Sequence, residues 1–502
     1  VGSEMCIRDS TWSVPEQTQA EIETVIYHKN DNDALGEVNF MPAKQGPAIV
    51  TMATLADDPE SGVTKSAENV YIVSKDVTVP ADKEFRLDGG LTVRLADGVQ
   101  IQLNGPASLG ATGARTLVTR NAETDAPKGF YLLYDGPQTT LIRNLDFEYA
   151  SLRNFGERGF DMQDCSFRLS NGKLNSAGAV SLGKSGANFR IARCSFSENS
   201  VPAIGGGANI YCGLQMSDCS LFDNNTANTN KPQINVTVGG DLPVVLRNIN
   251  ITGTGREKVG GLAVGNMMSG GGANTVIIDS VSVRECRYGI TGMGPQSMTI
   301  SNCYLYNNNH ETNPNAGGSG ISLSSIGQEA GISGCHIENS LWGVTLIKSP
   351  ANLGQVGNWM SPGLNVFLNN GNSGSGSYVP YDLYNNSSYT VFAQNNTWSV
   401  PEQTEAEIEK VIFHKNDNAA LGEVIFMPAM GSGAVSGITS DEGLRIADGM
   451  ITCPDATDAC VYTTDGRLAA RLPLVDGAAE IPSLPRGIYI VRAGKYALKV
   501  RM

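Results

Sequence analysis

The chain has 502 residues, with 36 Lys or Arg and 50 Asp or Glu, so its formal net charge is −14. Apolar residues make up 41% and charged residues only 17%, which is too apolar and too weakly charged for a disordered chain. The acidic balance argues against nucleic-acid binding, because no basic stripe is present to release counterions from a phosphate backbone. No run approaches the ~18 apolar residues of a membrane span.

Residues 1–10, VGSEMCIRDS, fit no structural element and resemble a translated sequencing adapter of a metagenomic assembly. We treat this stretch as a non-native remnant and leave it, with Cys6, out of the fold prediction. The chain starts at Val1 rather than Met, so the lack of a visible signal peptide says nothing about export.

A long repeat follows. Residues 11–43 (the first copy) and 397–429 (the second copy) match at 28 of 33 positions. Each copy predicts one short helix, since Thr18 and Glu21 have capping-box spacing and apolar residues follow at helical period. A short strand then ends each copy, which suits a lid over an open β edge. Because the second copy closes a β-rich region, we expect the first to close a preceding, missing β-helix domain.

Both copies contain the string HKNDN, with His28 in the first and His414 in the second. A turn that ends the helix is one interpretation. The other is a Ca²⁺ loop formed by the side chains of Asn30, Asp31, Asn32 and Asp33. Asp33 becomes Ala419 in the second copy, which weakens the Ca²⁺ interpretation, and we predict no cofactor.

Between about 140 and 356 the pattern apolar-x-apolar-x-x-apolar-x-apolar recurs, as in Phe160, Met162, Cys165 and Phe167. Alternation places every second side chain on one face, and the two-residue interruption requires a bend that keeps this face inward. Polar residues that tolerate left-handed backbone occupy the bends, namely Asn144, Asp164, Asp218, Asn248 and Asn302. A third short strand follows many copies, so each coil of 20–32 residues has three strands and three corners.

This pattern resembles the right-handed parallel β-helix, or pectin-lyase-like, superfamily over roughly residues 60–400. The resemblance implies an all-β, single-stranded solenoid with a short capping helix, and residues 70–103 are expected to form its first coils. At ~4.8 Å per coil, roughly 12–14 coils would stack along one axis. A shared fold does not assign a function.

Five cysteines fall on the same inward position of the pattern: Cys165, Cys194, Cys219, Cys303 and Cys335. We interpret them as a stack of small buried side chains, since free Cys is among the most buried residue types. A metal site or disulfides are the alternatives. Stacked strand positions seldom have disulfide geometry, and the chain has no CxxC pair.

One outward column runs Asn250, Ser282, Tyr304 and His336 on successive coils, which places Tyr304 and His336 about 5 Å apart. Such a pair could abstract a proton beside a uronate carboxylate, as a polysaccharide lyase requires. A solvated strand face is the other interpretation. A glycoside hydrolase would need carboxylates facing one bond, whereas Asp146, Asp164 and Asp218 are spread over different columns.

Long polar loops are expected at 224–232, 307–319 and 369–396. The last is rich in tyrosine. Its rings could stack on sugars or anchor the loop, and the candidates for glycan binding are Tyr378, Tyr381, Tyr384 and Tyr389.

After a Gly/Ser-rich linker at 430–443, residues 444–502 predict a small β-sandwich. This segment resembles the C-terminal sorting domain of the Bacteroidetes type IX secretion system. The matching residues are Asp465, Gly466, Arg467, Leu484, Pro485, Gly487, Ile488, Tyr489, Val491 and Arg492. The resemblance implies export by outer-membrane secretion machinery, with the tail removed and the protein attached to the cell surface. Whether Cys453 pairs with Cys460 stays open, and an accessory β-sandwich unrelated to export is the alternative.

The expected plan is therefore a β-helix domain over 44–429, closed by the cap 397–429, a linker and a sorting domain over 444–502. We predict a secreted protein on the surface of a Gram-negative bacterium, acting as a structural, adhesive or glycan-binding module. A polysaccharide lyase or glycoside hydrolase acting on acidic polysaccharide is the alternative, so the sequence leaves enzymatic activity open. A spacer for a missing module is the third possibility.

Overall fold

The computed structural model describes most of the chain. The undescribed residues are 1–4, 7–12, 15–17, 36–37, 41–46, 111–112, 174–176, 207–210, 267–273, 431–442, 448–449, 464–467, 483, 485–487, 495 and 502. Contacts divide the chain into two units, 1–399 with 408–425 and 400–407 with 426–502. Residues 400–407 thus group with the C-terminal unit, although the repeat places them in the cap. The described part contains no helix long and apolar enough to cross a membrane.

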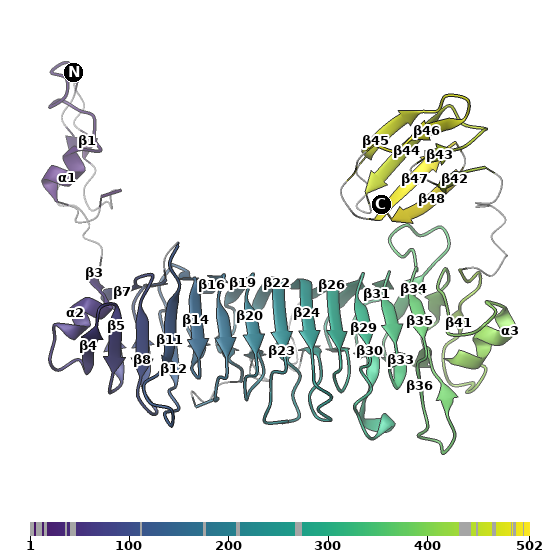
Figure 1. The fold of residues 1–502 in the computed structure, drawn as a ribbon, viewed down its shortest axis with the longest axis horizontal. Coiled ribbons are helices and arrows are strands. Elements are labelled where there is room, and N and C mark those ends of the chain that lie inside the picture. The colour runs from purple at the N-terminus through teal and green to yellow at the C-terminus, as the bar shows by residue number, and fades with distance from the viewer. Residues whose placement is uncertain are drawn as a thin grey trace. The chain divides into compact units, whose positions relative to one another are not determined.

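The first unit contains a parallel β-helix with three walls (Figure 1). Wall 1 consists of β7 (Lys83–Leu87), β10 (Ala107–Leu109), β13 (Thr140–Arg143), β16 (Gly159–Gln163), β19 (Asn188–Ala192), the first halves of β22 (Gly213–Phe222), β24 (Val244–Thr252) and β26 (Thr275–Arg284), then β28 (Ser297–Ser301), β31 (Ala330–Ser333), β34 (Ala351–Gly354), β39 (Val391–Ala393) and β41 (Val424–Ile425). Wall 2 consists of β5 (Val70–Val73), β8 (Thr92–Leu95), β11 (Thr116–Arg120), β14 (Leu145–Glu148), β17 (Ser166–Arg168), β20 (Ser195–Ser197), the second halves of β22, β24 and β26, then β29 (Tyr304–Tyr306), β32 (His336–Glu338) and β35 (Val366–Leu368).

Wall 3 is a sheet with one strand per coil. In order along the axis it contains β6 (Val77–Val79), β9 (Gln100–Leu103), β12 (Gly129–Leu132), β15 (Ser151–Asn154), β18 (Val180–Leu182), β21 (Ile204–Gly206), β23 (Ile234–Thr237), β25 (Leu262–Gly265), β27 (Ile290–Met293), β30 (Ser319–Ser324), β33 (Trp342–Ile347), β38 (Leu383–Asn386) and β40 (Ile412–Phe413). These 13 strands of the described chain agree with the coil number expected from the repeat.

The corners between walls 1 and 2 confirm the predicted bends. Asn144, Asp164, Asp218, Asn248 and Asn302 all have φ between 49° and 57°, in the left-handed region. A second left-handed column ends wall 2 and was not predicted; it includes Glu198, Asp223, Asn307 and Asn339. Asx side chains tolerate this backbone conformation, which favours them at both corners, and Tyr149 and Leu169 also adopt it in the second column.

In the interior, side chains of the same type stack on one another from coil to coil. The rings of Phe147 and Phe167 are 4.5 Å apart and nearly parallel, and Phe196 continues this stack at 5.4 Å. Cys165, Cys194, Cys219, Cys303 and Cys335 are buried and free, together with Cys212 and Cys286. The interpretation as buried core cysteines is therefore confirmed.

Buried asparagines at the inner corners were missed by the sequence analysis. Asn199 donates to the carbonyl of Phe167 at 3.1 Å and to Asn224 Oδ1 at 2.6 Å, and Asn224 donates in turn to the carbonyl of Phe196. Each amide satisfies backbone groups that the corner leaves without a ladder partner. A polar residue is thus required at a fully buried position.

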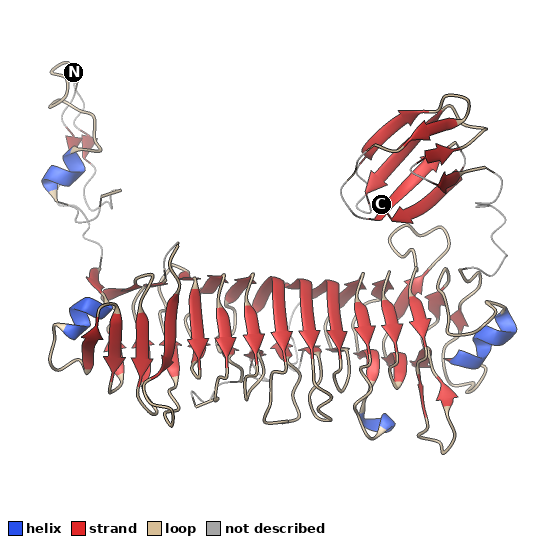
Figure 2. Cartoon of the chain, in the orientation of Figure 1, coloured by secondary structure: helices blue, strands red, loops and turns tan. Residues whose placement is uncertain are grey.

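Both ends of the β-helix are covered. At the start, the strands β3 (Ala48–Val50) and β4 (Val63–Ala67) flank the short helix α2 (Met52–Ala56) (Figure 2). The Thr51 N-cap of this helix forms a capping box with Thr54. This end was not predicted. At the other end, the second copy contributes β40, paired with β38, and β41, paired with β39. Its helical part comprises α3 (Glu405–Ile408) and the 3-10 helix η2 (Glu409–Val411).

The first copy forms α1 (Gln19–Glu23) with the predicted capping box between Thr18 and Glu21. Its strand β2 (Val38–Asn39) pairs with β1 (Met5–Cys6), a strand within the stretch interpreted as non-native.

The C-terminal unit is a β-sandwich, as expected. One sheet contains β42 (Arg445–Ala447), β43 (Met450–Thr452) and β46 (Ala478–Glu480); the other contains β45 (Leu468–Pro473), β44 (Asp458–Thr463), β47 (Ile488–Ala493) and β48 (Tyr496–Arg501). Ile451 of the first sheet, and Cys453 directly after its strand β43, share a core with Val461 and Val491 of the second sheet. Cys453 and Cys460 are both free.

Candidate glycan-binding face

The outward side chains of wall 2 form two aligned columns, which we call the hydroxyl face. The first column is Ser195, Ser220, Asn250, Ser282, Tyr304 and His336, and the second is Ser197, Phe222, Thr252, Arg284, Tyr306 and Glu338. The strand register places each residue directly beside its counterpart on the next coil. The predicted column from Asn250 to His336 is therefore real, and its parallel neighbour was missed.

Small polar side chains leave a hollow of about 420 Å³ in this face, between coils β20 and β26. Five of its ten lining residues are serine or threonine, and two larger side chains, Phe222 and Arg284, also line it. Phe222 is 47% exposed, and the other outward residue of its coil on wall 2 is the small Ser220. Arg284 donates from Nε to Thr252 Oγ1 at 3.0 Å and makes no ion pair with any described residue.

The predicted pair of Tyr304 and His336 lies one coil beyond this hollow. Their rings stack with centroids 4.8 Å apart, and Tyr304 remains 44% exposed. His336 Nε2 lies 2.8 Å from Glu338 Oε2. Partial burial, with the nearby Glu338 charge, raises the pKa of the Tyr304 phenol. A phenol that holds its proton more tightly serves as a stacking surface or hydrogen-bond donor better than as a base.

The carboxylates of this region do not form a hydrolytic pair. Asp146 is held by Arg115 and Ser166, which lower the pKa of Asp146 against the opposing effect of burial. Glu148 pairs with Arg168 and lies two coils before the start of the hydroxyl face, and Glu338 lies seven coils from Glu148, roughly 30 Å. A glycoside hydrolase needs its two carboxyl groups within about 10 Å.

The remaining acidic candidates are occupied at corners. Asp164 accepts two hydrogen bonds from Arg193 at 2.7 Å, which lowers the pKa of this carboxyl. Asp218 accepts a hydrogen bond from Asn248 Nδ2 at 2.6 Å. These two carboxylates bind corner residues of the next coil instead of facing a groove.

The four tyrosines of the 369–396 segment do not form one platform. Tyr381 and Tyr384 pack against Trp342, with ring centroids 4.5 and 4.9 Å away, and Tyr384 also stacks on Phe413 of the second copy. Tyr378 and Tyr389 are exposed. Trp342 and Tyr384 line a second hollow of about 290 Å³ on wall 3, closed on one side by the 3-10 helix η1 (Pro314–Ala316).

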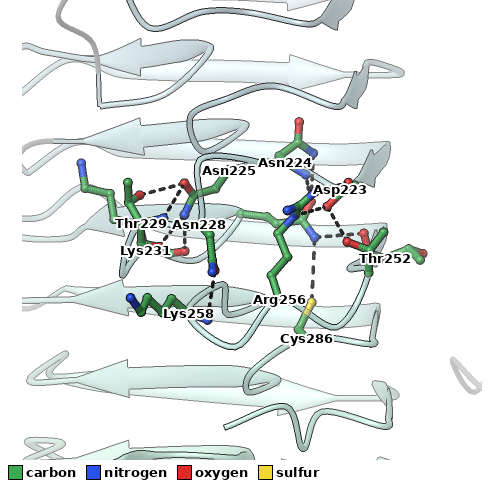
Figure 3. A network of polar contacts seen from close by, with 12 residues as sticks. Asp223, Asn224, Asn225, Asn228, Thr229, Lys231, Thr252, Arg256, Lys258 and Cys286 are labelled. Carbon is green, nitrogen blue, oxygen red and sulfur yellow. Dashed lines mark hydrogen bonds and ion pairs between the residues drawn. The ribbon is translucent and has the colours of Figure 1, made fainter. Parts of the chain in front are cut away.

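The polar loops at 224–232 and 307–319 are anchored by internal hydrogen bonds. Arg256 donates to both oxygens of Asp223, at 2.7 and 2.8 Å, which lowers the pKa of Asp223 (Figure 3). Asn225 Nδ2 donates to the carbonyls of Thr229 and Lys231, which fixes the first loop on its own corner. Arg287 joins the two loops through Glu311 and Asn230. Most polar groups here are used for structure.

The HKNDN strings form the same turn in both copies. His414 Nε2 lies 3.0 Å from Glu409 Oε1, its Nδ1 accepts from the Val424 N–H at 2.8 Å, and its own N–H donates to Asp417. In the first copy, Asp31 and Asn32 likewise accept backbone hydrogen bonds within the turn. Within the described ranges, no three His, Cys, Asp or Glu side chains lie close enough to hold a metal.

Of the residues that match the sorting domain, Tyr489 and Val491 lie in the core of the sandwich and Leu484 packs against it. Arg492 is exposed, and Ile488 begins the strand β47. Asp465, Gly466, Arg467, Pro485 and Gly487 lie outside the described residues.

No protein-family model and no curated protein matches this chain. Among solved structures, the periplasmic alginate epimerase AlgG aligns with 11% identity and a TM-score of 0.39, over 76% of this chain and 84% of that chain. Two mutants of AlgG align over the same shares, with TM-scores of 0.44 and 0.40 and identities of 12% and 11%. A likeness at this level assigns neither a substrate nor a reaction to this chain.

Proposed function

We propose that this protein is a glycan-binding β-helix module and that the hydroxyl face is its binding surface. The observation that carries the proposal is the hollow itself, where serine and threonine hydroxyls, Asn250, Arg284 and the exposed Phe222 ring meet on adjacent coils. Sugars present hydroxyls and apolar ring faces together. A surface that offers matched hydrogen-bonding groups beside an aromatic ring suits both.

The direction of the face supports an extended ligand. The two columns repeat at every coil, so a linear polysaccharide lying along the axis would meet similar groups at regular intervals. Arg284 adds a cation that can pair with a uronate carboxylate, whereas the chain as a whole carries a charge of −14. We therefore expect a linear, partly acidic polysaccharide rather than a highly charged one.

The proposal is tested by titrating the full chain with neutral polysaccharides and polyuronates in a calorimeter. Phe222→Ala and Arg284→Ala are each expected to weaken binding about tenfold, which corresponds to ~1.4 kcal/mol. Tyr378→Ala is the matched control, because it removes an exposed aromatic ring from a different loop. Unchanged binding in both face variants, with loss in Trp342→Ala, would move the site to the hollow on wall 3.

The competing function is a polysaccharide lyase or hydrolase. The same samples are assayed for unsaturated ends and for new reducing ends. Turnover that disappears in His336→Ala and Tyr304→Phe would replace binding by catalysis. The raised pKa of Tyr304 and the separation of the carboxylates favour binding.

We further propose that the C-terminal sandwich directs export to the cell surface through a type IX secretion system. The support is the string from Leu484 to Arg492, whose strand β47 is central in its sheet. Fractionation of a Bacteroidetes host that expresses the full chain tests this. The full chain should reach the surface and a chain ending at residue 443 should stay in the periplasm; equal surface display of both would refute the export role.

A further inference from the structure

The first and second copies are internally equivalent. In the second, Glu409 binds His414 and Asn416, and Val424 N–H donates to the imidazole. In the first, Glu23 binds His28 and Asn30, and Val38 N–H donates to His28 Nδ1 at 3.4 Å. The buried side chains Ile22 and His28 match Ile408 and His414. Thus the described residues of the first copy form the same polar framework as those of the cap.

The two copies differ in what their outer surfaces contact. Val411 is 2% exposed, because the cap packs on the last coil of the β-helix, and its counterpart Val25 is 46% exposed. Phe413 lies in β40 and stacks on Tyr384 at 4.7 Å, whereas its counterpart Tyr27 is 72% exposed. The residues that dock the second copy are therefore present but uncovered in the first.

The second copy shows what this surface binds. Its two strands extend walls 3 and 1 of the last coil, and Ser399 donates from its N–H and its hydroxyl to the buried Asp382, at 2.8 and 2.5 Å. Ser13 stands at the position of Ser399.

We propose that the first copy docks on the last coil of a second parallel β-helix, which precedes it in the complete protein. That coil presents an apolar strand edge to Val25 and Tyr27 and a buried carboxylate to Ser13, as Leu383, Tyr384 and Asp382 do for the second copy. The order follows from the second copy, where the coil directly precedes its cap. The protein is accordingly a tandem of end-capped β-helices, whether or not either binds glycan.

The first test replaces the sequence of the second copy by that of the first copy in the full chain. The variant Glu405→Gln, Lys410→Thr, Phe413→Tyr, Ala419→Asp, Ile425→Asn converts the second copy into the first. We expect a cooperatively folded β-helix with a thermal midpoint within roughly 5 °C of the parent. Loss of the β-strand circular dichroism signal would overturn the proposal, since the first copy would then be unable to cap.

The second test opens the last coil. Val411→Asp with Ile412→Asp displaces the second copy, so the first copy of a neighbouring molecule can dock there. We expect concentration-dependent head-to-tail oligomers in light scattering, which Val25→Asp with Tyr27→Asp abolishes. Oligomers that persist in the quadruple variant, or a folded monomer without those two changes, would overturn docking. If the variant with Val411→Asp and Ile412→Asp unfolds, the five-substitution variant of the first test decides whether the first copy can act as a cap.

Discussion

The buried carboxylate of Asp382 accepts hydrogen bonds from both the backbone N–H and the hydroxyl of Ser399. Asn370 Nδ2 donates to the other oxygen at 3.1 Å. Asp382 has no solvent exposure, and burial raises its pKa to about 6 despite these three donors. The joint between the last coil and the second copy therefore contains an acid that ionises close to neutral pH.

Asp382→Asn should change the pH dependence of stability. Because the folded pKa lies above the unfolded value of 3.8, the wild-type contribution is fully present only below that value and is lost as pH rises from there through about 6. The difference in unfolding free energy between wild type and variant should fall by about 3 kcal/mol between pH 3 and pH 8. Urea titrations at several pH values measure this, with the exposed Asp241→Asn as control; a difference that stays constant with pH would contradict it.

Two phenylalanines that lie two coils apart should differ in how much their truncation costs. Phe167 lies in the interior ring stack, so Phe167→Ala should destabilise the β-helix by about 3–5 kcal/mol. Phe222 faces outward, so Phe222→Ala should change stability by less than about 1 kcal/mol while weakening glycan binding. Thermal unfolding of both variants checks which columns face inward and which face outward. Equal losses of stability in the two variants would contradict this assignment.

The buried thiols should not react with a thiol reagent in the native protein. Burial raises the pKa of Cys212 and of Cys286 to about 12, so neither supplies thiolate at pH 8. In a Cys6→Ser background, we expect a thiol reagent to label Cys460, the half-buried cysteine of the sandwich, and the others only after unfolding. Cys460→Ser removes the native signal; fast labelling that survives this change would show that the cysteine stack is open to solvent.

Replacing one leucine by glycine should stabilise the fold. Leu364 is exposed with φ at 63°, a conformation that costs a residue with a Cβ roughly 1–2 kcal/mol. Leu364→Gly should gain about 0.5–1 kcal/mol after the entropy that glycine adds to the unfolded chain. Leu141, equally exposed but within strand β13, supplies the control, since Leu141→Gly should lose a similar amount. Melting temperatures that shift in the same direction would refute the strain at Leu364.

The walls and corners were predictable because side-chain alternation and Asx residues are local signals. Phe160 and Met162 point inward, and Asn144 and Asp164 turn the chain, as the pattern requires. The buried amides of Asn199 and Asn224 were not predictable in the same way. From sequence alone, an asparagine in a loop is expected to be exposed. Only the stacking of coils shows that these amides replace missing ladder hydrogen bonds.

The candidate site was half visible in the sequence. Tyr304 and His336 occupy equivalent pattern positions, so their contact could be predicted. Phe222 directly follows the inward residue Leu221, and Arg284 directly follows the inward residue Val283. Because a loop begins soon after each of them, the sequence pattern did not show that Phe222 and Arg284 lie in the same outward column. The tyrosines were chosen for composition alone, and composition could not tell that Tyr384 packs under the cap while Tyr378 is exposed.

The constant register along wall 2 has an evolutionary consequence. Since each strand bonds only to the coils before and after it, the loops between them vary while the columns stay aligned. A single coil can therefore be duplicated, deleted or exchanged as a cassette, and each exchange replaces two outward side chains without moving the others. Evolution can therefore change the ligand preference of such a surface by exchanging one coil at a time. The first and last coils are less free to change, because each must fit its cap.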